Sequence, residues 1–219
     1  GSPLPLSLHS CVILKRNRMD EKLPLNPLLA TYKSLLFKWA KVINLVSPAT
    51  LADVDARHFQ DSLQLIPLLP AHTKTLFDLG SGAGFPGLVI ALERPDIRVH
   101  LFESDTKKCS FLSTVSRETH IPVVIHNHRI ESVDKIPDVV PDVISARALA
   151  SLDNLLALTE VWWSHHPQVT LLFPKGAKAD DEIATARESY DFTLETFPSQ
   201  TEKNARILRI THVKRRPRF

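Results

Sequence analysis

Apolar residues recur at intervals of three and four positions across 28–43, which is the spacing of an amphipathic helix. Lysines lie off this apolar stripe, at Lys33, Lys38 and Lys41. A second helix is expected from Ser47-Pro48, an N-cap residue followed by a first-turn proline. A third helical pattern passes through 58–63 and ends near a proline at 67 or 70. The pattern therefore predicts a small helical unit before residue 74.

From residue 74 onward, short apolar runs alternate with helical patterns. The runs predict strands near 75–79, 98–103, 122–127, 141–146 and 168–173. The helical patterns lie near 86–93, 106–118, 151–163 and 179–189. This alternation predicts an α/β fold, a parallel sheet with helices on both faces. After residue 190, two strand patterns at 192–197 and 207–213 follow each other without a helix between them, so a closing antiparallel hairpin is expected.

Composition narrows the class of protein. The 219 residues are 43% hydrophobic and 23% charged, which suits one globular domain with an extension and excludes wholesale disorder. No apolar run approaches the roughly 20 residues that span a bilayer, so we expect a soluble, cytoplasmic protein without a membrane partner. Cys11 and Cys109 are expected to be reduced thiols. His126-x-His128 lacks further ligands at metal-binding spacing, and His165-His166 adjoin Pro167 at an expected helix end, where they face solvent, so no metal site is expected.

The two ends of the chain differ from its centre. Residues 1–18 precede the only methionine, Met19, and begin with a Gly-Ser pair typical of a tag remnant, so we expect this segment to be non-native or disordered. We assign 19–73 to a helical extension, 74–213 to a ligand-binding domain and 214–219 to a basic tail. The net charge is only +3, but cations prevail at both flanks, which suits a polyanionic partner.

A glycine-rich turn dominates the candidate chemistry. Four of the six glycines lie within 78–87, between an apolar run and a buried helical pattern. Strand, glycine turn and helix is the arrangement that places a nucleotide-like ligand over a helix N-terminus. The spacing Gly82-x-Gly84-x-x-Gly87 satisfies the dinucleotide fingerprint. The spacing Asp78-x-Gly80-x-Gly82-x-Gly84 instead matches the loop that holds S-adenosylmethionine (SAM) in Rossmann-like methyltransferases.

Residues around the turn favour SAM over NAD. A pyrophosphate needs backbone N–H donors, yet Pro86 has none, and the Asp78 carboxylate would repel it. SAM has no phosphate and carries an ammonium and a sulfonium, which tolerate a nearby carboxylate. Glu103 follows Gly84 by nineteen residues, at the end of the next strand, where an acid accepts hydrogen bonds from the ribose hydroxyls of either cofactor.

Later strand ends supply further candidates. After the third strand, Glu131 is placed to meet an adenine amino group, and Ile130 offers a backbone N–H. Arg147 follows the fourth strand and Lys175 closes the fifth. Both lie where ligands bind in open α/β folds, at the carboxyl ends of the strands.

Taken in order, these motifs resemble the small-subunit ribosomal RNA methyltransferase G family, also called glucose-inhibited division protein B. The resemblance covers about 28–213. Its marks are Trp39 with Asn44-Leu45, His58-x-x-Asp61-Ser62-Leu63, the turn at 78–87, Arg94-Pro95, Ser104 with Lys107 and Phe111-Leu112, Arg129-x-Glu131, Ser145-Ala146-Arg147-Ala148 and Lys175-Gly176. The sequence departs from the family at Ala40 (usually Asn), at Glu103 (usually Asp) and at Lys108 (usually Arg).

The resemblance implies a class I SAM-dependent methyltransferase with a mostly parallel seven-stranded sheet. It further implies methyl transfer to N7 of a guanine in the decoding region of 16S rRNA. Because N7 has a lone pair and no proton, alignment of the reactants matters more than a base. By match with the family, cofactor contacts fall on Gly80, Phe85, Ile130, Glu131 and Arg147, which join Asp78, Gly82, Gly84 and Glu103. Arg147 and Lys175 are the candidates for holding the guanine O6 edge.

The implied partner is 16S rRNA, in the small ribosomal subunit or its assembly intermediate, and we expect a monomer. Phosphate contacts are expected from the lysines of the first helix and from the tail at 214–218. Two alternatives stay open: a SAM-dependent methyltransferase that acts on a protein or small molecule, and a regulator that binds NAD.

Overall fold

The computed structural model describes residues 26–132 and 138–217, so the segment 1–18 lies outside the described residues. The helical extension comprises α1 (Pro27–Ala40), α2 (Pro48–Leu51), the π-helical η1 (Asp55–Gln60), α3 (Asp61–Leu63) and the 3-10 turn η2 (Ile66–Leu68). The rest of the chain forms β1 (Thr75–Leu79), α4 (Gly87–Glu93), β2 (Arg98–Phe102), α5 (Thr106–Thr119), β3 (Val124–His126), β4 (Val143–Ala146), α6 (Leu152–Leu158), α7 (Glu160–Trp163), β5 (Thr170–Lys175), α8 (Ala179–Ser189), β6 (Tyr190–Pro198) and β7 (Arg206–Arg215).

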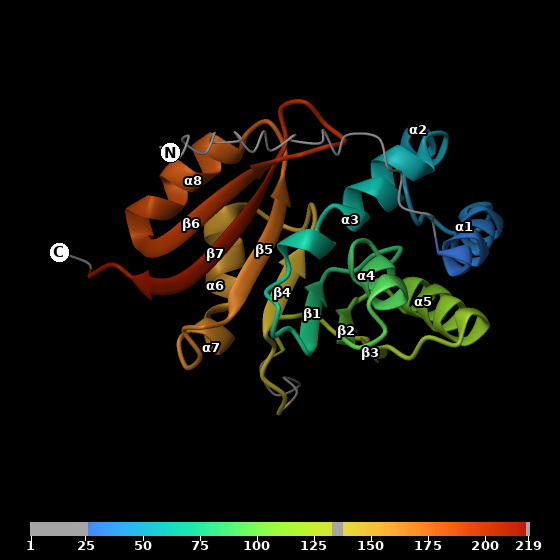
Figure 1. Cartoon of the computed structure of the whole chain (residues 1–219), viewed down its shortest axis with the longest axis horizontal. Coiled ribbons are helices and arrows are strands. Elements are labelled where there is room, and N and C mark those ends of the chain that lie inside the picture. Colours follow the sequence, from blue (N-terminus) through green and yellow to red (C-terminus); the bar gives the residue numbers. More distant parts are fainter. Residues whose placement is uncertain (1–25, 133–137, 218–219) are drawn as a thin grey trace, which may run out of the picture.

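The strands form one seven-stranded sheet in the order β3-β2-β1-β4-β5-β7-β6 (Figure 1). β1 to β5 are parallel, and β7 pairs antiparallel with both β5 and β6. Leu79 is level with Phe102 on one side and with Ala146 on the other, so β1, β2 and β4 end together. The fold class predicted from the sequence, including the closing hairpin, is confirmed.

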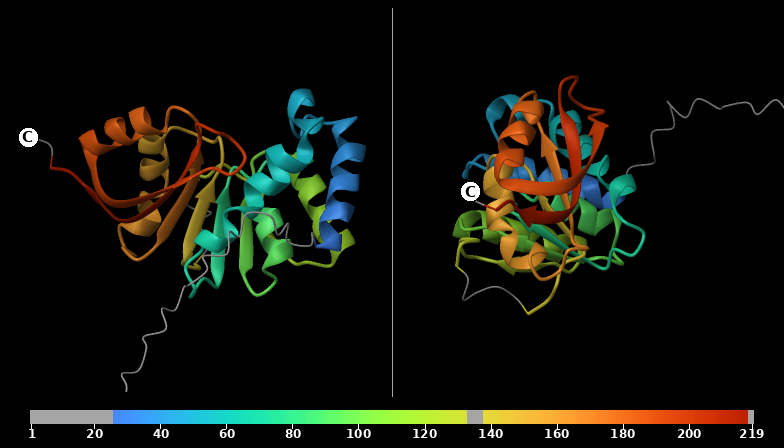
Figure 2. Two further views of the ribbon diagram at one scale, coloured as in Figure 1. Left: turned by 45° about the horizontal axis from the view of Figure 1, so that its top comes forward. Right: turned by 90° about the vertical axis from the view of Figure 1, so that its left-hand side faces the viewer.

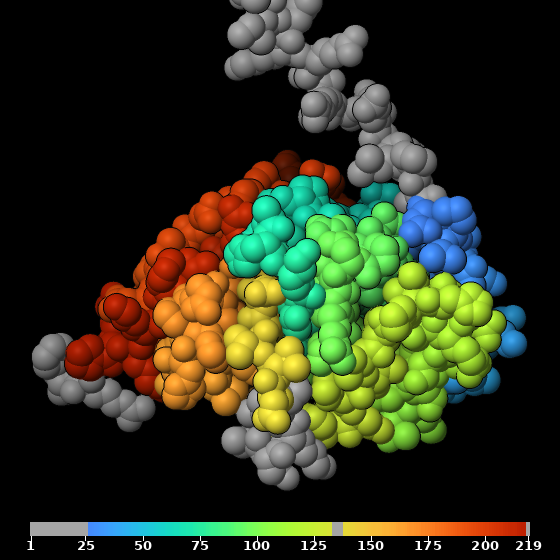
Figure 3. Space-filling view, turned by 60° about the horizontal axis from the view of Figure 1, so that its bottom comes forward, coloured from blue at the N-terminus to red at the C-terminus, as the bar shows by residue number. Residues whose placement is uncertain are grey.

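Two hydrophobic cores lie on opposite faces of the sheet. One contains Leu76 of β1 with residues of α1, α4 and α5, and the other contains Phe77 with residues of α6, α8, β6 and β7. Because α1 shares its core with α4 and α5, the extension packs as part of the same body as the sheet (Figure 2). The hairpin and α1 lie at opposite ends of the molecule (Figure 3).

Helix boundaries follow local chemistry. Asn26 caps α1 by accepting from the Leu28 N–H, and its side-chain amide donates to the Leu92 carbonyl of α4 at 3.0 Å. The expected helix through 43 ends at Ala40, and Val42 is 78% exposed, beyond the reach of the core. The expected helix at 151–163 is divided at Thr159, whose hydroxyl donates back to the Leu155 carbonyl, a contact that bends helices.

The basic tail begins later than predicted from the sequence. Strand β7 runs to Arg215, because 214 and 215 pair with the start of β6. Arg215 forms an ion pair with Glu160, and Arg216 forms one with Asp191 at 2.8 Å. Two cations assigned to RNA contact are therefore paired within the protein. None of the helices in the described ranges combines the length and apolar character that a bilayer crossing requires.

Candidate functional site

Asp78 supports the glycine turn from beneath. Its side chain is fully buried, and its carboxylate accepts from the Ser145 hydroxyl at 2.8 Å and from the Gly87 N–H at 3.1 Å. Burial raises the pKa of this carboxyl to about 6, although the Ser145 hydrogen bond opposes the shift. The Asp78 side chain therefore acts on the turn and on β4, and it does not face an exposed ligand surface.

Gly80, like Gly84 and Gly87 of the same turn, leaves no room for a side chain. Its φ is +65°, in the left-handed region, and a Cβ there would lie 2.7 Å from Leu149 Cδ1. Leu149 belongs to the segment after β4, so this segment reaches over the turn. Gly82 and Gly84 also have positive φ values.

The ring of Phe85 stacks with two aromatic residues of the helical extension. Tyr32 stacks on it at 5.3 Å and 17°, and His58 stacks on it at 4.9 Å and 22°. The Tyr32 hydroxyl donates to the Ala83 carbonyl, and burial raises the pKa of Tyr32. Because the Phe85 side chain is only 3% exposed, its backbone is what remains for a ligand contact. The extension thus fixes the shape of the turn.

Glu103 joins the end of β2 to the turn. One carboxylate oxygen accepts from the Gly82 N–H at 2.9 Å, and the other accepts from the Asp105 N–H at 2.8 Å. Each oxygen has a second lone pair, which leaves acceptor capacity for two hydroxyls. The Glu103 side chain therefore reaches the backbone of the turn from the end of β2.

Ile130 and Glu131 lie in a turn after β3. Ile130 packs against the hydrophobic core that contains Phe77, and Glu131 is exposed and forms no hydrogen bond with another described residue.

His126 approaches His100, with 2.9 Å between ring nitrogens, and stacks on Phe102. Within 26–132 and 138–217, no group of three or more His, Cys, Asp or Glu residues is arranged to hold a metal ion.

Arg147 connects the end of β4 to the helical extension. Its Nη1 donates to Asp61 Oδ2 at 3.2 Å and to the Arg57 carbonyl at 3.3 Å, and its Nη2 lies 2.9 Å from His58 Nδ1. Its guanidinium carbon lies 5.2 Å from the centroid of the Phe85 ring. Arg147 is therefore placed beside the glycine turn and the extension at once.

Lys175 ends β5 and is occupied by internal partners. Its Nζ donates to the Ala150 carbonyl at 2.6 Å and lies 3.0 Å from Glu182 of α8. Glu182 also accepts from the Leu152 N–H at 2.9 Å. The ion pair is largely buried, so Lys175 fixes the segment after β4 against α8.

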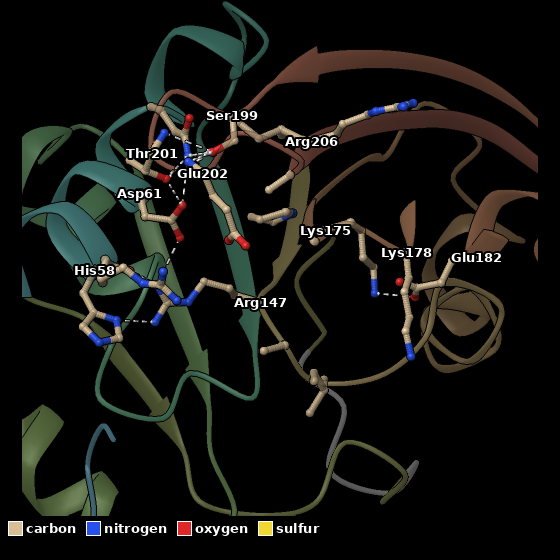
Figure 4. A pocket seen from close by; sticks show the side chains of 18 of the residues that line it. His58, Asp61, Arg147, Lys175, Lys178, Glu182, Ser199, Thr201, Glu202 and Arg206 are labelled. Carbon is tan, nitrogen blue, oxygen red and sulfur yellow. Dashed lines mark hydrogen bonds and ion pairs between the residues drawn. The ribbon is translucent and has the colours of Figure 1, made fainter. Parts of the chain in front are cut away.

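Arg147 and Lys175 face one cavity at the carboxyl edge of the sheet, with a volume of about 690 Å³ (Figure 4). Its walls come from the helical extension, the segment after β4, the end of β5 and the turn between β6 and β7. Cations at its lining are Arg57, Arg147, Lys175, Lys178 and Arg206, and carboxylates are Asp61, Glu182 and Glu202. None of the described residues of the glycine turn lines this cavity, but Arg147 lines it and lies over the Phe85 ring, so the cavity adjoins the turn.

The sequence pointed to two of these five cations. Arg57, Lys178 and Arg206 belong to no motif, and only the meeting of three distant segments makes them neighbours. His58 and Asp61 belong to a motif of the family resemblance, but the sequence assigns neither of them a role. Their spacing of three within one motif was the signal that both face the same side of a helix.

Comparisons with known proteins agree with this architecture. The family model described as "GidB: rRNA small subunit methyltransferase G" matches residues 25–208. A ribosomal RNA small subunit methyltransferase G of Rhodospirillum centenum is 48% identical over 186 residues, which are 84% of this chain and 83% of the relative. One of Methylorubrum extorquens is 46% identical over 191 residues, 85% and 88% of the two chains.

Solved structures match the fold at low sequence identity. An O-methyltransferase from Bacillus cereus in complex with SAH aligns with a TM-score of 0.58 at 12% identity, over 88% of this chain and 94% of that one. A putative O-methyltransferase from Klebsiella pneumoniae aligns with a TM-score of 0.57 at 13% identity, over 87% and 92%. This likeness shows the fold, that of the class I SAM-dependent methyltransferases.

Proposed function

Because this chain belongs to the rRNA small subunit methyltransferase G family, we propose that it transfers the methyl group of SAM to N7 of a guanine in the decoding region of 16S rRNA. The family is the one that the sequence motifs predicted. The observation that carries the proposal is the position of Arg147, which touches the Phe85 ring of the glycine turn and also lines the adjoining cavity. A donor site and an acceptor site thus share one residue.

The residues of the turn fit the expected cofactor. Gly80 takes the left-handed backbone conformation that shapes the turn, and Glu103 retains acceptor capacity for ribose hydroxyls beside Gly82. Ile130 and Glu131 are the proposed adenine contacts. When bound, SAM supplies an electrophilic methyl group. Asp78 and Tyr32 act on the cofactor through the turn that they hold, and His58 acts through the turn and through Arg147.

The cavity offers what an N7 acceptor requires. Guanine N7 carries no proton, so the protein must align N7 with the methyl carbon and sulfur and need not remove a proton. Arg147 has five N–H donors, of which three meet Asp61, the Arg57 carbonyl and His58, so two are left for a guanine O6 edge. Lys175, held by Glu182 and Ala150, is the proposed support of the cavity wall.

The proposed partner is 16S rRNA in the small ribosomal subunit or its assembly intermediate, met by a monomeric enzyme in the cytoplasm. Lys33 is paired with Asp55 at 2.7 Å, whereas Lys38 of the same helix and Lys41, which follows its last residue, are exposed. Among the cations that line the cavity, Arg206 is paired with Asp180 at 2.6 Å, so we assign phosphate contacts first to Lys178.

Mapping of methylated guanines in 16S rRNA by mass spectrometry tests the reaction. Cells without this gene are expected to lose one N7-methylguanine, and the purified protein with SAM is expected to restore it. An unchanged N7-methylguanine would remove the rRNA assignment. Methyl transfer to a protein or small molecule without rRNA would support that alternative, and tight NAD binding without SAM binding would support the regulator.

A further inference from the structure

The Asp61 carboxylate faces two parts of the chain that are far apart in sequence. Its Oδ2 accepts from Arg147 Nη1 at 3.2 Å. Its Oδ1 accepts from the Thr201 hydroxyl at 2.8 Å and from the Gln64 side-chain amide at 3.0 Å. Figure 4 shows Asp61 between Arg147 below and the Thr201 segment above. One carboxylate therefore links the arginine after β4 with the turn between β6 and β7.

The hairpin turn depends on this region of the extension for its position. Gln64 accepts from the Gln200 N–H at 2.8 Å, and its amide also lies 3.3 Å from the Ser199 hydroxyl. Thr201 in turn donates to Asp61. Ser199, Thr201 and Glu202 all line the cavity, so these contacts fix one of its walls.

Arg147 is held by the same helical segment from another direction. A guanidinium only donates, so His58 Nδ1 must be the acceptor of the Arg147 Nη2 contact, and the ring proton resides on Nε2. Burial, together with the charge of Arg147, lowers the pKa of His58 to about 4, which keeps the ring neutral at pH 7. His58 thus directs Nη2 while Asp61 directs Nη1.

We propose that Asp61 is a positioning residue, which aims the Arg147 guanidinium at the donor site and fastens the hairpin turn as the wall of the acceptor cavity. His58 shares only the first task, and Thr201 shares only the second. The inference rests on the proposed function, since it assigns Arg147 to the donor and acceptor sites and the hairpin turn to the acceptor side. The proposal predicts that substitutions at Asp61, His58 and Thr201 affect kcat and KM differently.

Three variants separate the two tasks. Asp61→Asn keeps the shape of the side chain and removes its charge. It is expected to lower kcat at least tenfold and to raise KM for the small ribosomal subunit several-fold. His58→Phe keeps a ring on Phe85 and removes the Nδ1 acceptor; it is expected to lower kcat with KM for small subunits within twofold. Thr201→Val is expected to raise that KM with kcat within twofold. Asp53→Asn, exposed in the same extension, is the matched control and should change neither.

A purely structural role would give a different pattern. It would lower the melting temperature of all three variants and leave kcat and KM unchanged at temperatures below unfolding. Wild-type kinetics for Asp61→Asn, or a loss of kcat in Thr201→Val equal to that in Asp61→Asn, would overturn the proposal. If Asp61→Asn fails to fold, the opposite effects of His58→Phe and Thr201→Val on kcat and KM still decide it.

Calorimetry with SAM alone makes the inference independent of the rRNA assignment. Asp61→Asn and His58→Phe are expected to weaken SAM binding about fivefold, whereas Thr201→Val and Asp53→Asn should bind it as the wild type does. If the wild type binds SAM and leaves rRNA unmethylated, the proposed acceptor fails while this binding pattern still supports the role of Asp61 in directing Arg147. Equal SAM affinities in all variants would contradict that role.

Discussion

The imidazole of His58 stacks on the phenyl ring of Phe85, with ring centroids 4.9 Å apart and 22° between the planes. Phe85 lies in the glycine turn, and His58 lies in η1 of the helical extension. Tyr32 of α1 stacks on the same ring, with centroids 5.3 Å apart. The extension is therefore a structural part of the proposed cofactor site, and changes in it should reach SAM binding through the turn.

Tyr32→Phe tests this dependence. The variant keeps the ring on Phe85 and removes the hydrogen bond to the buried Ala83 carbonyl. We expect a loss of about 1–3 kcal/mol in the free energy of unfolding, because a buried acceptor is left unsatisfied. SAM affinity should fall several-fold. Urea unfolding measures the change in stability, and titration calorimetry measures the change in SAM affinity. Phe37→Tyr, which adds a hydroxyl to an exposed residue of the same helix, serves as the control; equal behaviour of the two variants would contradict the argument.

Gly80→Ala should disable cofactor binding. The new Cβ would lie 2.7 Å from Leu149 Cδ1, at a φ of +65° that alanine rarely adopts. A cost of about 1–2 kcal/mol in folding is expected from the left-handed backbone, with at least a tenfold loss of SAM affinity. Gly176→Ala is the matched control, because no atom lies within 4 Å of its added Cβ. Unchanged SAM affinity in Gly80→Ala would place the cofactor elsewhere.

Glu103→Gln should weaken SAM binding, although Gln has nearly the same shape as Glu. One end of the amide must present N–H to a backbone N–H, either that of Gly82 or that of Asp105. Leaving one of these donors unsatisfied costs about 1–3 kcal/mol, and the charge that would meet the ribose is lost as well. Titration calorimetry should show at least tenfold weaker binding. Glu188→Gln, exposed on α8, should bind SAM as tightly as the wild type.

Asp78 should make the free energy of unfolding fall as pH rises, whereas most carboxylates make it rise. Because its pKa is raised to about 6 in the folded protein, the native state retains a proton that the unfolded chain loses near pH 4. The contribution of this proton is complete below about pH 4, declines as pH rises and is lost above about pH 6. The shift of about two pKa units corresponds to roughly 3 kcal/mol.

Urea unfolding of the wild type and of Asp78→Asn from pH 4 to pH 8 measures this contribution. The amide does not titrate, so the difference in unfolding free energy between the two proteins isolates Asp78. We expect the advantage of the wild type over the variant to shrink between pH 4 and pH 6 and then to stay constant. An advantage that grows with pH over this range would mean that the carboxylate is stabilised in its charged form.

Lys178→Gln should reduce the salt dependence of RNA binding. Lys178 is exposed at the start of α8 and lines the cavity. Removal of one phosphate contact lowers the slope of log affinity against log salt by about one. Binding of a 16S rRNA fragment between low and moderate salt measures this slope. Lys74→Gln, exposed before β1 at the opposite end of the parallel strands, should keep the wild-type slope.

Several features of the site were predictable from local sequence. The positions of the glycine turn, of Glu103 after β2 and of Arg147 after β4 follow from strand patterns and strand-end residues, because the carboxyl ends of parallel strands share one edge. Element boundaries were less accurate where one residue decides them. Thr159 divides α6 from α7 where its hydroxyl donates to the Leu155 and Leu156 carbonyls, and the pairing of β6 with β7 extends the last strand to Arg215.

The sequence by itself determined the order of elements, the family and the edge of the sheet that carries the site, because periodicity, turn chemistry and motif spacing act over a few residues. Only the tertiary structure decided which side chains surround Arg147. Asp61 meets Arg147 across 86 positions and Thr201 across 140, contacts that no local pattern encodes. They exist because β7 lies between β5 and β6, which brings the hairpin turn back over the carboxyl edge of the sheet, against the extension.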